Sequence, residues 1–277
     1  MSGRFAAIDE HALLRHLVAG TVDSTGTAFF RALVRNLAEA LVVRAAWVTE
    51  YQAEAGRLQA LAFWVDGDWT EGYAYDIAGT PCERVVTTDT VACIPTGVID
   101  LFPEDPDLAT LDAVSYFSEP LHDEAGRVIG NLAVIDDRPL DEDARLRDVF
   151  RLFAARAAGE ARRLLADRAR RASDERARRL VDCVHDAIIE CDAALVISQA
   201  NPAARTLLSL PEDGLPGRRL IDHLDADYRR RLLAEITSLD EATGTRAAHL
   251  IPGGLVLRDG AGGAVPVEAS IARAHQR

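Results

Sequence analysis

Lysine is absent from this chain. All 31 basic residues are arginine, and 44 acidic residues outnumber them, so the net charge is −13. We attribute the missing lysine to a GC-rich genome rather than to function. A chain of this charge repels phosphate groups, so nucleic-acid binding is not expected. The four cysteines contain no CxxC pair, which indicates reduced thiols rather than a disulfide framework.

Long apolar runs are also missing. No stretch approaches roughly eighteen consecutive apolar residues, so the sequence predicts no membrane span. The first residues, MSGRFAAIDEHALL, lack the basic start and the apolar run of a signal peptide. We therefore expect a cytoplasmic protein that does not contact a membrane.

The common catalytic motifs are absent as well. The sequence contains no GxxxxGK[ST], GxGxxG, HExxH, GxSxG or GGDEF-like stretch. His122-Asp123 and His185-Asp186 resemble the paired ligands of metal phosphohydrolases, but neither pair has a supporting cluster of His and Asp. We interpret both as coincidental. The sequence therefore predicts no catalytic residue and no metal site, and we expect that this chain is not itself an enzyme.

What the chain does contain is one long helical stretch, residues 141–184. These residues include no proline and a single glycine, Gly159, and a helix of about forty residues is roughly 60 Å long. Acidic residues at 141–143 suit the positive end of the helix dipole. An apolar seam with near-heptad spacing follows. Its members are Leu146, Phe150, Phe153, Ala157, Ala161 and Leu164.

The middle of this helix is basic. Residues 151–180 contain ten arginines and four acidic residues, a net charge of +6. Such arginines are typical of a solvated helix face. The alternative interpretation is a parallel two-stranded coiled coil with a weak middle that can slip or rotate between two states. From the seam we predict a parallel homodimer.

The region before the helix, residues 1–140, shows alternating helix and hairpin signals. Residues 27–42 form an amphipathic pattern, and Thr80, Pro81 and Glu83 form a capping box that starts a further helix. The remaining expected elements are a short helix at 10–18, a hairpin turning at 54–56, a proline-rich loop at 94–108 and a hairpin turning at 123–126.

This order of elements resembles a GAF domain. The matching stretches are GTPCERV (79–85), FPED (102–105), SYFSEPL (115–121) and GRVIGNLAVIDDRPL (126–140). The NKxnFx3DE pattern of cyclic-nucleotide-binding GAF domains is absent, and so is the Cys-His pair that attaches bilins in phytochromes. The resemblance implies a ligand pocket without naming its ligand, which could be a small molecule. The candidate pocket residues are Trp64, Tyr75, Cys82, Cys93 and Tyr116.

Two of these candidates are thiols. Cys82 is expected at the second position of a helix, where the helix dipole lowers the pKa of a thiol. The alternative function is therefore a thiol-based redox or metal sensor that uses Cys82 and Cys93. The simpler interpretation is that both are small apolar residues in or near the core.

The region after the helix, residues 185–277, is similar to a PAS domain. The resemblance rests on a strand–turn–strand leading into NPAA, on PGRRL, on a DG turn and on VPVEASIA. Asn201 and Pro202 start a helix, Asp225 caps another, and 259–263 is a hairpin turn. The resemblance makes Asn201 and His223 candidate pocket residues, although a helix cap and a surface histidine are the simpler interpretations.

No cofactor follows from these resemblances. The stretch GRRLIDHL (217–224) lacks the reactive cysteine of flavin-binding LOV domains, so a flavin–cysteine adduct is not expected, and neither is bilin attachment. PAS sheets normally end with a further strand, and here the sequence stops at Arg277. We expect that the chain is a fragment and that an output domain is missing.

Taken together, the sequence predicts an α+β protein with two antiparallel-sheet sensor domains joined by a long helix. The expected parts are a GAF-like domain at 1–140, a signalling helix at 141–184 and a PAS-like domain at 185–277. The resemblance implies a sensory and dimerisation region of a bacterial signalling protein, of the sensor kinase or cyclic-dinucleotide enzyme type.

Overall fold

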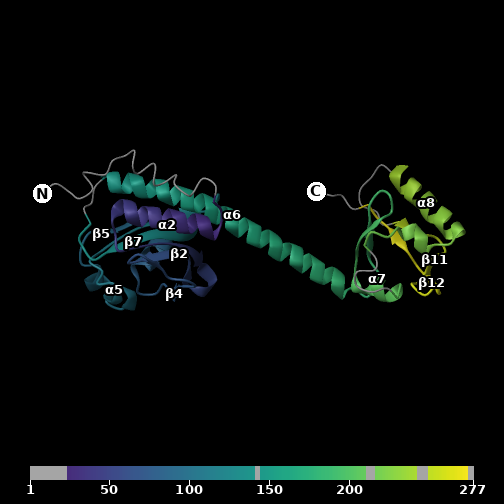
Figure 1. The fold of residues 1–277 in the computed structure, drawn as a ribbon, viewed down its shortest axis with the longest axis horizontal. Helices are drawn as coiled ribbons and strands as arrows, with labels where there is room; N and C mark the ends of the chain where they lie inside the picture. Colours follow the sequence, from purple (N-terminus) through teal and green to yellow (C-terminus); the bar gives the residue numbers. More distant parts are fainter. Residues whose placement is uncertain (1–23, 141–143, 210–215, 242–248, 274–277) are drawn as a thin grey trace. The chain divides into compact units, whose positions relative to one another are not determined.

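The computed structural model describes residues 24–140, 144–209, 216–241 and 249–273. The chain divides into two units, Met1–Ala169 and Arg170–Arg277 (Figure 1). The helix predicted for residues 10–18 lies outside the described residues. The α+β class and the two antiparallel-sheet domains are confirmed.

A seven-stranded antiparallel sheet forms the centre of the first unit, in the order β3-β2-β1-β7-β6-β5 with β4 beside β2. Both predicted hairpins are confirmed as the β1–β2 and β6–β7 pairs. Strands β3, β4 and β5 were not predicted, because two or three residues are too few to show an alternating pattern. The strands are β1 (Ala45–Gln52), β2 (Arg57–Val65), β3 (Asp68–Trp69), β4 (Ala74–Asp76), β5 (Ala92–Ile94), β6 (Ser115–His122) and β7 (Val128–Asp136).

Helices cover both faces of this sheet. On one face lie α2 (Thr27–Leu41) and the first part of α6 (Ala144–Cys183). On the other lie α3 (Pro81–Thr88), α4 (Val98–Leu101) and α5 (Pro106–Thr110). The prediction of a loop at 94–108 was therefore wrong in part, because this stretch contains the last residue of β5, all of α4 and the start of α5. Two separate apolar clusters result, one for each face of the sheet.

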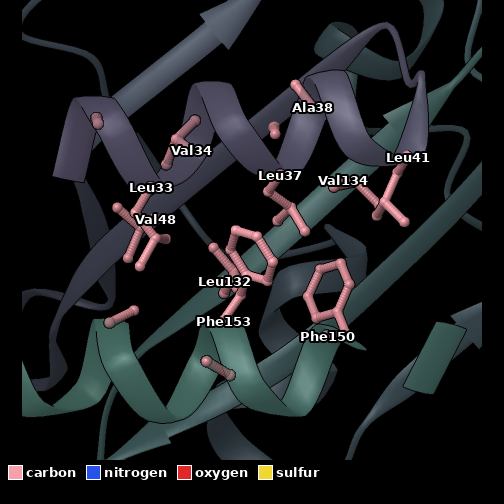
Figure 2. Packing of buried hydrophobic residues seen from close by; sticks show 14 of the residues in the cluster. Leu33, Val34, Leu37, Ala38, Leu41, Val48, Leu132, Val134, Phe150 and Phe153 are labelled. Atoms are coloured by element: carbon pink, nitrogen blue, oxygen red, sulfur yellow. The ribbon is translucent and has the colours of Figure 1, made fainter. Parts of the chain in front are cut away.

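The apolar seam of α6 packs inside its own domain. Figure 2 shows Phe150 and Phe153 directed at the sheet and at α2, and the Phe150 ring lies 4.6 Å from the ring of Phe117. The prediction that this seam forms the dimer contact was wrong, because the same chain already covers it. Five of its residues are buried, and Leu164 is partly buried against the same cluster; the six are Leu146, Phe150, Phe153, Ala157, Ala161 and Leu164.

The second part of α6 is different, because its apolar side chains are exposed. Leu180, Val181 and Val184 retain 66%, 40% and 39% of their exposure. Residues 168–182 of the helix are exposed throughout. The long helix predicted from the sequence is therefore confirmed, but its two halves have different surroundings.

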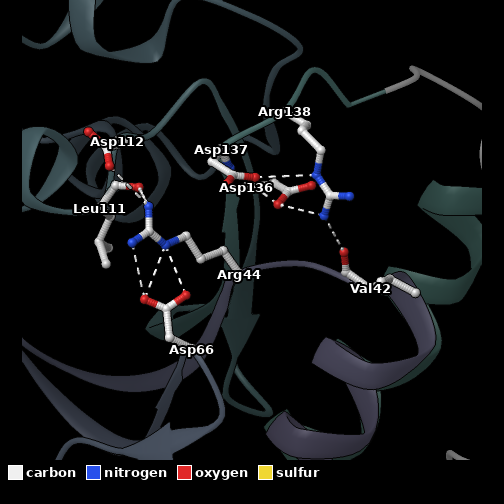
Figure 3. Close-up of polar contacts among 8 residues, drawn as sticks. All are labelled: Val42, Arg44, Asp66, Leu111, Asp112, Asp136, Asp137 and Arg138. Atoms are coloured by element: carbon white, nitrogen blue, oxygen red, sulfur yellow. Dashed lines mark hydrogen bonds and ion pairs between the residues drawn. The ribbon is translucent and has the colours of Figure 1, made fainter.

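Two arginines tie the edges of the first domain together (Figure 3). The guanidinium of Arg44 donates to both carboxylate oxygens of Asp66, at 2.9 and 3.1 Å, and to the carbonyl oxygen of Leu111 at 2.6 Å. Arg138 donates to the carbonyl oxygen of Val42 at 3.1 Å, just after α2. Arg44 thus connects the start of β1 to the end of β2 and to the segment after α5.

The predicted capping box at the start of α3 is confirmed with one difference. The Thr80 hydroxyl accepts a hydrogen bond from the Glu83 N–H, as expected. The Glu83 carboxylate accepts from the N–H of Gly79 at 2.9 Å rather than from Thr80, whose N–H donates to the carbonyl of Ile77. Pro81 occupies the first helical position.

The second unit contains three two-stranded antiparallel sheets around a small apolar core. The predicted strand–turn–strand, the helix capped by Asn201 and the hairpin at 259–263 are all confirmed. The elements are β8 (Ile189–Cys191), β9 (Ile197–Ala200), α7 (Pro202–Leu207), η3 (Leu220–His223), α8 (Ala226–Glu241), β10 (His249–Leu250), β11 (Leu255–Arg258), β12 (Ala264–Val267) and β13 (Ser270–Ile271).

Candidate ligand-binding site

A small cavity lies between the sheet of the first domain and the helices α3 and α5. Its volume is about 30 Å³, which is enough for one water molecule. Five of its twelve lining residues are aromatic, and two are aspartates. Its lining residues include Trp47, Tyr73, Tyr75, Cys82, Asp105, Asp107 and Tyr116.

One hydrogen-bond donor in this wall lacks a partner. Trp47 is 6% exposed, and within the described part of the chain its indole Nε1–H donates to no acceptor. Buried polar groups are almost always hydrogen-bonded, so an orphaned donor beside a cavity indicates that a water or a ligand accepts from it. The cavity therefore has a polar side that the protein itself does not satisfy.

The floor of the cavity is a buried polar cluster centred on the thiol of Cys82. Its Sγ lies 3.1 Å from the hydroxyls of both Tyr75 and Tyr116 and 3.6 Å from Nδ2 of Asn131. The same amide donates to Ser118 Oγ at 2.9 Å, and its carbonyl oxygen accepts from the Thr49 hydroxyl. These groups join α3 to four strands of the sheet, β1, β4, β6 and β7.

Burial controls the protonation of this cluster. It raises the pKa of Cys82, against the hydrogen bonds from Tyr116, Tyr75 and Asn131, which lower it. Burial also raises the pKa values of Tyr75 and Tyr116 well above the ordinary value. The expectation that the α3 dipole lowers the pKa of Cys82 was therefore wrong, because burial outweighs the helix end.

Two aspartates close the cavity from the side of α5. Burial raises the pKa of the Asp105 carboxyl, and the charge of Asp107 adds to that effect. The Tyr73 hydroxyl donates to the Asp107 carboxylate, and burial followed by this hydrogen bond raises the pKa of Tyr73. Both aspartates line the cavity, so it offers acceptors opposite the Trp47 donor.

The structure brings three of the five predicted pocket residues together: Tyr75, Cys82 and Tyr116. The prediction was wrong for Trp64, which packs against the cluster on the opposite face of the sheet. Cys93 packs against that same cluster and does not line this cavity, but it lines a second cavity that is described below. Trp64 instead stacks edge-on against Trp69, with ring centroids 4.8 Å apart.

This placement also corrects the thiol hypothesis. Cys82 and Cys93 lie on opposite faces of the sheet, so they do not form a redox pair or a shared metal site. Among the described residues, moreover, no group of three or more His, Cys, Asp or Glu is arranged to hold a metal ion.

Sequence reasoning missed Trp47, Tyr73, Asp105 and Asp107. The signal for Trp47 was available in the first hairpin, because cross-strand partners share a face of the sheet. Trp47 pairs with Phe63, whereas Trp64 pairs with Ala46. Choosing between the two tryptophans required the register, and the sequence alone leaves it open.

The two candidates in the second domain have structural roles. Asn201 is buried, and its Oδ1 accepts from the N–H groups of Ile188 and Ala204 at 2.9 and 3.0 Å. Its Nδ2 donates to the carbonyls of Val181, Val184 and Asp186, at 2.9–3.3 Å. These bonds use the whole amide, so the prediction of Asn201 as a ligand-binding residue was wrong.

His223 is also buried and joins two elements. Its Nδ1 carries the proton that is donated to the carbonyl of Arg258 at 3.0 Å, because a carbonyl only accepts. This bond holds η3 against the end of β11. Ligand binding by His223 stays a prediction.

Family models separate the two domains clearly. The GAF domain model matches residues 26–160, and the PAS fold model matches residues 175–264. The chain carries a GAF domain followed by a PAS domain. Both are sensory domains, so this region is a sensory module. The GAF match extends into α6, in agreement with the seam that packs in the GAF core.

Several solved structures are similar to this chain at low sequence identity. The GAF domain of an Acinetobacter phosphoenolpyruvate-protein phosphotransferase is 14% identical over 56% of this chain and 94% of that one, with a TM-score of 0.47. A free methionine-R-sulfoxide reductase from Neisseria meningitidis is 18% identical over 56% and 89%, with a TM-score of 0.44. The chromophore-binding domain of a bacteriophytochrome from R. palustris is 15% identical over 53% and 58%, with a TM-score of 0.40.

No curated protein matches this chain. Within the residues that the structure describes, no helix has both the length and the apolar character needed to cross a membrane.

The burial of Cys82 leads to a testable difference between thiols. We expect iodoacetamide at pH 8 to alkylate Cys183, which is exposed, about 1,000-fold faster than Cys82 in the folded protein. Peptide mass spectrometry after timed quenching measures each site. In urea the two rates should become equal. Comparable rates in the folded protein would contradict a closed cavity.

The pH dependence follows from the same burial. The folded-state pKa of Cys82 is raised, so its contribution to stability is complete below the unfolded-state pKa of about 8.5. That contribution is lost as the pH rises through the folded-state pKa. Folding stability should therefore decline in the alkaline range.

Proposed function

We propose that this GAF–PAS region is a non-catalytic dimeric sensor in which a small polar ligand of the GAF cavity is coupled to the PAS domain through α6. The observation that carries the proposal is the double role of this helix. Phe150 and Phe153 belong to the GAF core, and the last carbonyls of the helix accept hydrogen bonds from Asn201 of the PAS domain. A change of packing at either end therefore acts on one continuous element.

The polar groups of the GAF cavity define the ligand that we propose. The Trp47 N–H requires an acceptor, and the Asp105 carboxyl offers a site for a donor. A ligand larger than water needs more than the present volume of about 30 Å³. In this proposal α5, whose Asp107 and Leu108 line the cavity, moves outward when a ligand enters. Leu111, held by Arg44, lies at the end of that segment, so Arg44 limits the movement.

Binding changes the signalling state only if the ligand has different affinities for the two states. The GAF core offers a way to produce this difference, because the cavity and the α6 seam lie on opposite faces of one sheet. Tyr116 faces the cavity and its neighbour Phe117 contacts Phe150 of α6. A displacement of β6 caused by a ligand in the cavity would therefore change the packing of Phe117 against α6.

Dimerisation is the part of the proposal that is simplest to test. Exposed apolar residues gather at the end of α6, where a second copy of the same helix would cover Leu180, Val181 and the following residue Val184. We expect sedimentation and native mass spectrometry of the wild type to show two chains of 30.0 kDa. The Leu180→Asp/Val184→Asp variant should be monomeric, with at least a tenfold weaker association.

Leu152→Asp is the matched control, because Leu152 is an exposed leucine on the first half of α6. This variant should remain a dimer. A monomeric wild type at micromolar concentration would refute the dimeric sensor, and a dimer lost only in the Leu152 variant would move the contact to the first half of the helix. Additional small-molecule mass in the native spectrum would identify the ligand class.

A further inference from the structure

A second and larger cavity lies at the β5 edge of the GAF sheet, and it is distinct from the cavity around Cys82. Its volume is about 430 Å³, within the usual range of roughly 300–1,000 Å³ for small-molecule sites. Residues of α3, β5, β6 and α6 line it. This cavity therefore includes the first turns of the helix that joins the two domains.

Three guanidinium groups line this second cavity. Arg84 comes from α3, and Arg147 and Arg151 lie one turn apart on the same face of α6. Within the described part of the chain, Arg84 and Arg151 form no ion pair. Like charges four residues apart weaken a helix slightly, so helix stability does not explain the arrangement.

One carboxyl group, Glu119, also lines this cavity. Burial raises its pKa, and the charge of Arg151 and then of His122 lowers it. Even with Glu119 ionised, Arg84 and Arg151 alone outnumber the one carboxylate among the lining side chains. Residues 1–150 carry 26 acidic residues and 11 arginines, a net charge of −15. The positive cavity is therefore a local feature of an acidic domain.

Apolar side chains form the rest of the wall. Val91 and Ile94 border the edge strand β5, and Phe117 comes from β6. An inorganic ion would leave these side chains without a partner. A ligand with both a charged head and an apolar body fits the combination better.

We propose that this cavity binds a small organic anion, a carboxylate or phosphate head group on an apolar body. The head group lies between Arg84 and Arg151, because a guanidinium donates two parallel hydrogen bonds to such groups. The apolar body contacts the wall formed by Ile94 and Phe117. A bound anion thereby joins α3 and the β5 edge to the start of α6, which goes beyond the sensing that we propose for the Cys82 cavity.

Cys93 lines the same cavity and serves as a reporter. Iodoacetate is an anion and iodoacetamide is neutral, and each is attacked by the cysteine thiolate with loss of iodide. At each cysteine, the rate of alkylation by iodoacetate is divided by the rate of alkylation by iodoacetamide. The value for Cys93 is then divided by the value for the exposed Cys183, and this quotient measures how strongly the cavity enriches anions. We expect this quotient to fall about fivefold in the Arg84→Gln/Arg151→Gln variant.

Arg35→Gln removes an exposed arginine of α2 and is the matched control, which should leave the quotient unchanged. A second measurement uses the wild-type protein alone and so does not depend on variant folding. Benzoate should protect Cys93 from iodoacetamide at millimolar concentration, whereas the neutral analogue benzamide should not. Protection should weaken as salt concentration rises.

Three results would overturn the proposal. The first is an equal quotient in the wild type and the double variant. The second is equal protection by benzoate and benzamide. The third is equal protection by inorganic phosphate and benzoate, which would refute the requirement for an apolar body.

Discussion

Replacing Phe153 by alanine is expected to lower the free energy of unfolding of the GAF domain by about 3–5 kcal/mol. Phe153 is fully buried among residues of α2, α6 and the sheet (Figure 2), and its removal leaves a cavity that close-packed neighbours fill only in part. Urea unfolding followed by intrinsic tryptophan fluorescence measures the effect, because all three tryptophans belong to the GAF domain.

Leu152→Ala is the control for this prediction. Leu152 is the neighbouring residue on the same helix and is 45% exposed, so its truncation should cost less than about 1 kcal/mol. If Phe153→Ala left GAF stability unchanged and instead dissociated a dimer, the residues of the first half of α6 would form an intermolecular seam after all.

Replacing Asn201 by alanine is expected to destabilise the PAS domain by about 3 kcal/mol. The change removes the N-cap of α7 and leaves the N–H of Ile188 without its acceptor. It also releases the carbonyls of Val181, Val184 and Asp186. Hydrogen exchange measured by mass spectrometry would show faster exchange in β8, α7 and the end of α6.

Asn201→Asp separates the two roles of this side chain. An aspartate keeps an acceptor for the N–H groups of Ile188 and Ala204, but it donates nothing to the three carbonyls and places a negative charge beside them. We expect it to retain the start of α7 and to loosen the end of α6. Equal exchange in the wild type and both variants would show that Asn201 does not hold this junction.

Local signals predicted most of the fold, because each depends on neighbouring residues only. The α3 capping box, the cap at Asn201, the two GAF hairpins and the long helix are all in this class. The short strands at the sheet edges were missed, because β4 and β5 form only through their partners β2 and β6. Tertiary pairing decides such segments, and it leaves little trace in sequence.

The candidate site was predicted less well, and the reason is geometric. A strand presents alternate residues to opposite faces, so one residue of register decides whether a side chain reaches the cavity. The β1–β2 pairing also shifts between Val48 and Thr49, which sequence alone does not reveal. Tyr75 and Cys82 were predicted from their residue types alone. Trp64 was predicted instead of Trp47 because the sequence does not show the register of the β1–β2 pair.

The α6 seam shows a different ambiguity. A repeat of apolar residues every three or four positions buries one face of a helix, whether the partner is a second helix of another chain or the same domain. The six residues from Leu146 to Leu164 satisfy both descriptions. The burial in the structure decides for the GAF core.

Because α6 belongs to the GAF core at one end and contacts the PAS domain at the other, it limits where a gene fusion can join either domain to a new partner. A gene fusion that joined a new partner directly after β7 would remove Phe150 and Phe153 and uncover the part of the sheet face that α2 does not cover. A crossover after Leu164 would transfer the GAF domain intact. Each residue inserted beyond that point would turn the rest of the helix by about 100°. Insertions and deletions in this stretch are therefore expected in steps of about seven residues. Seven residues are close to two full turns, so the rest of the helix keeps almost the same orientation.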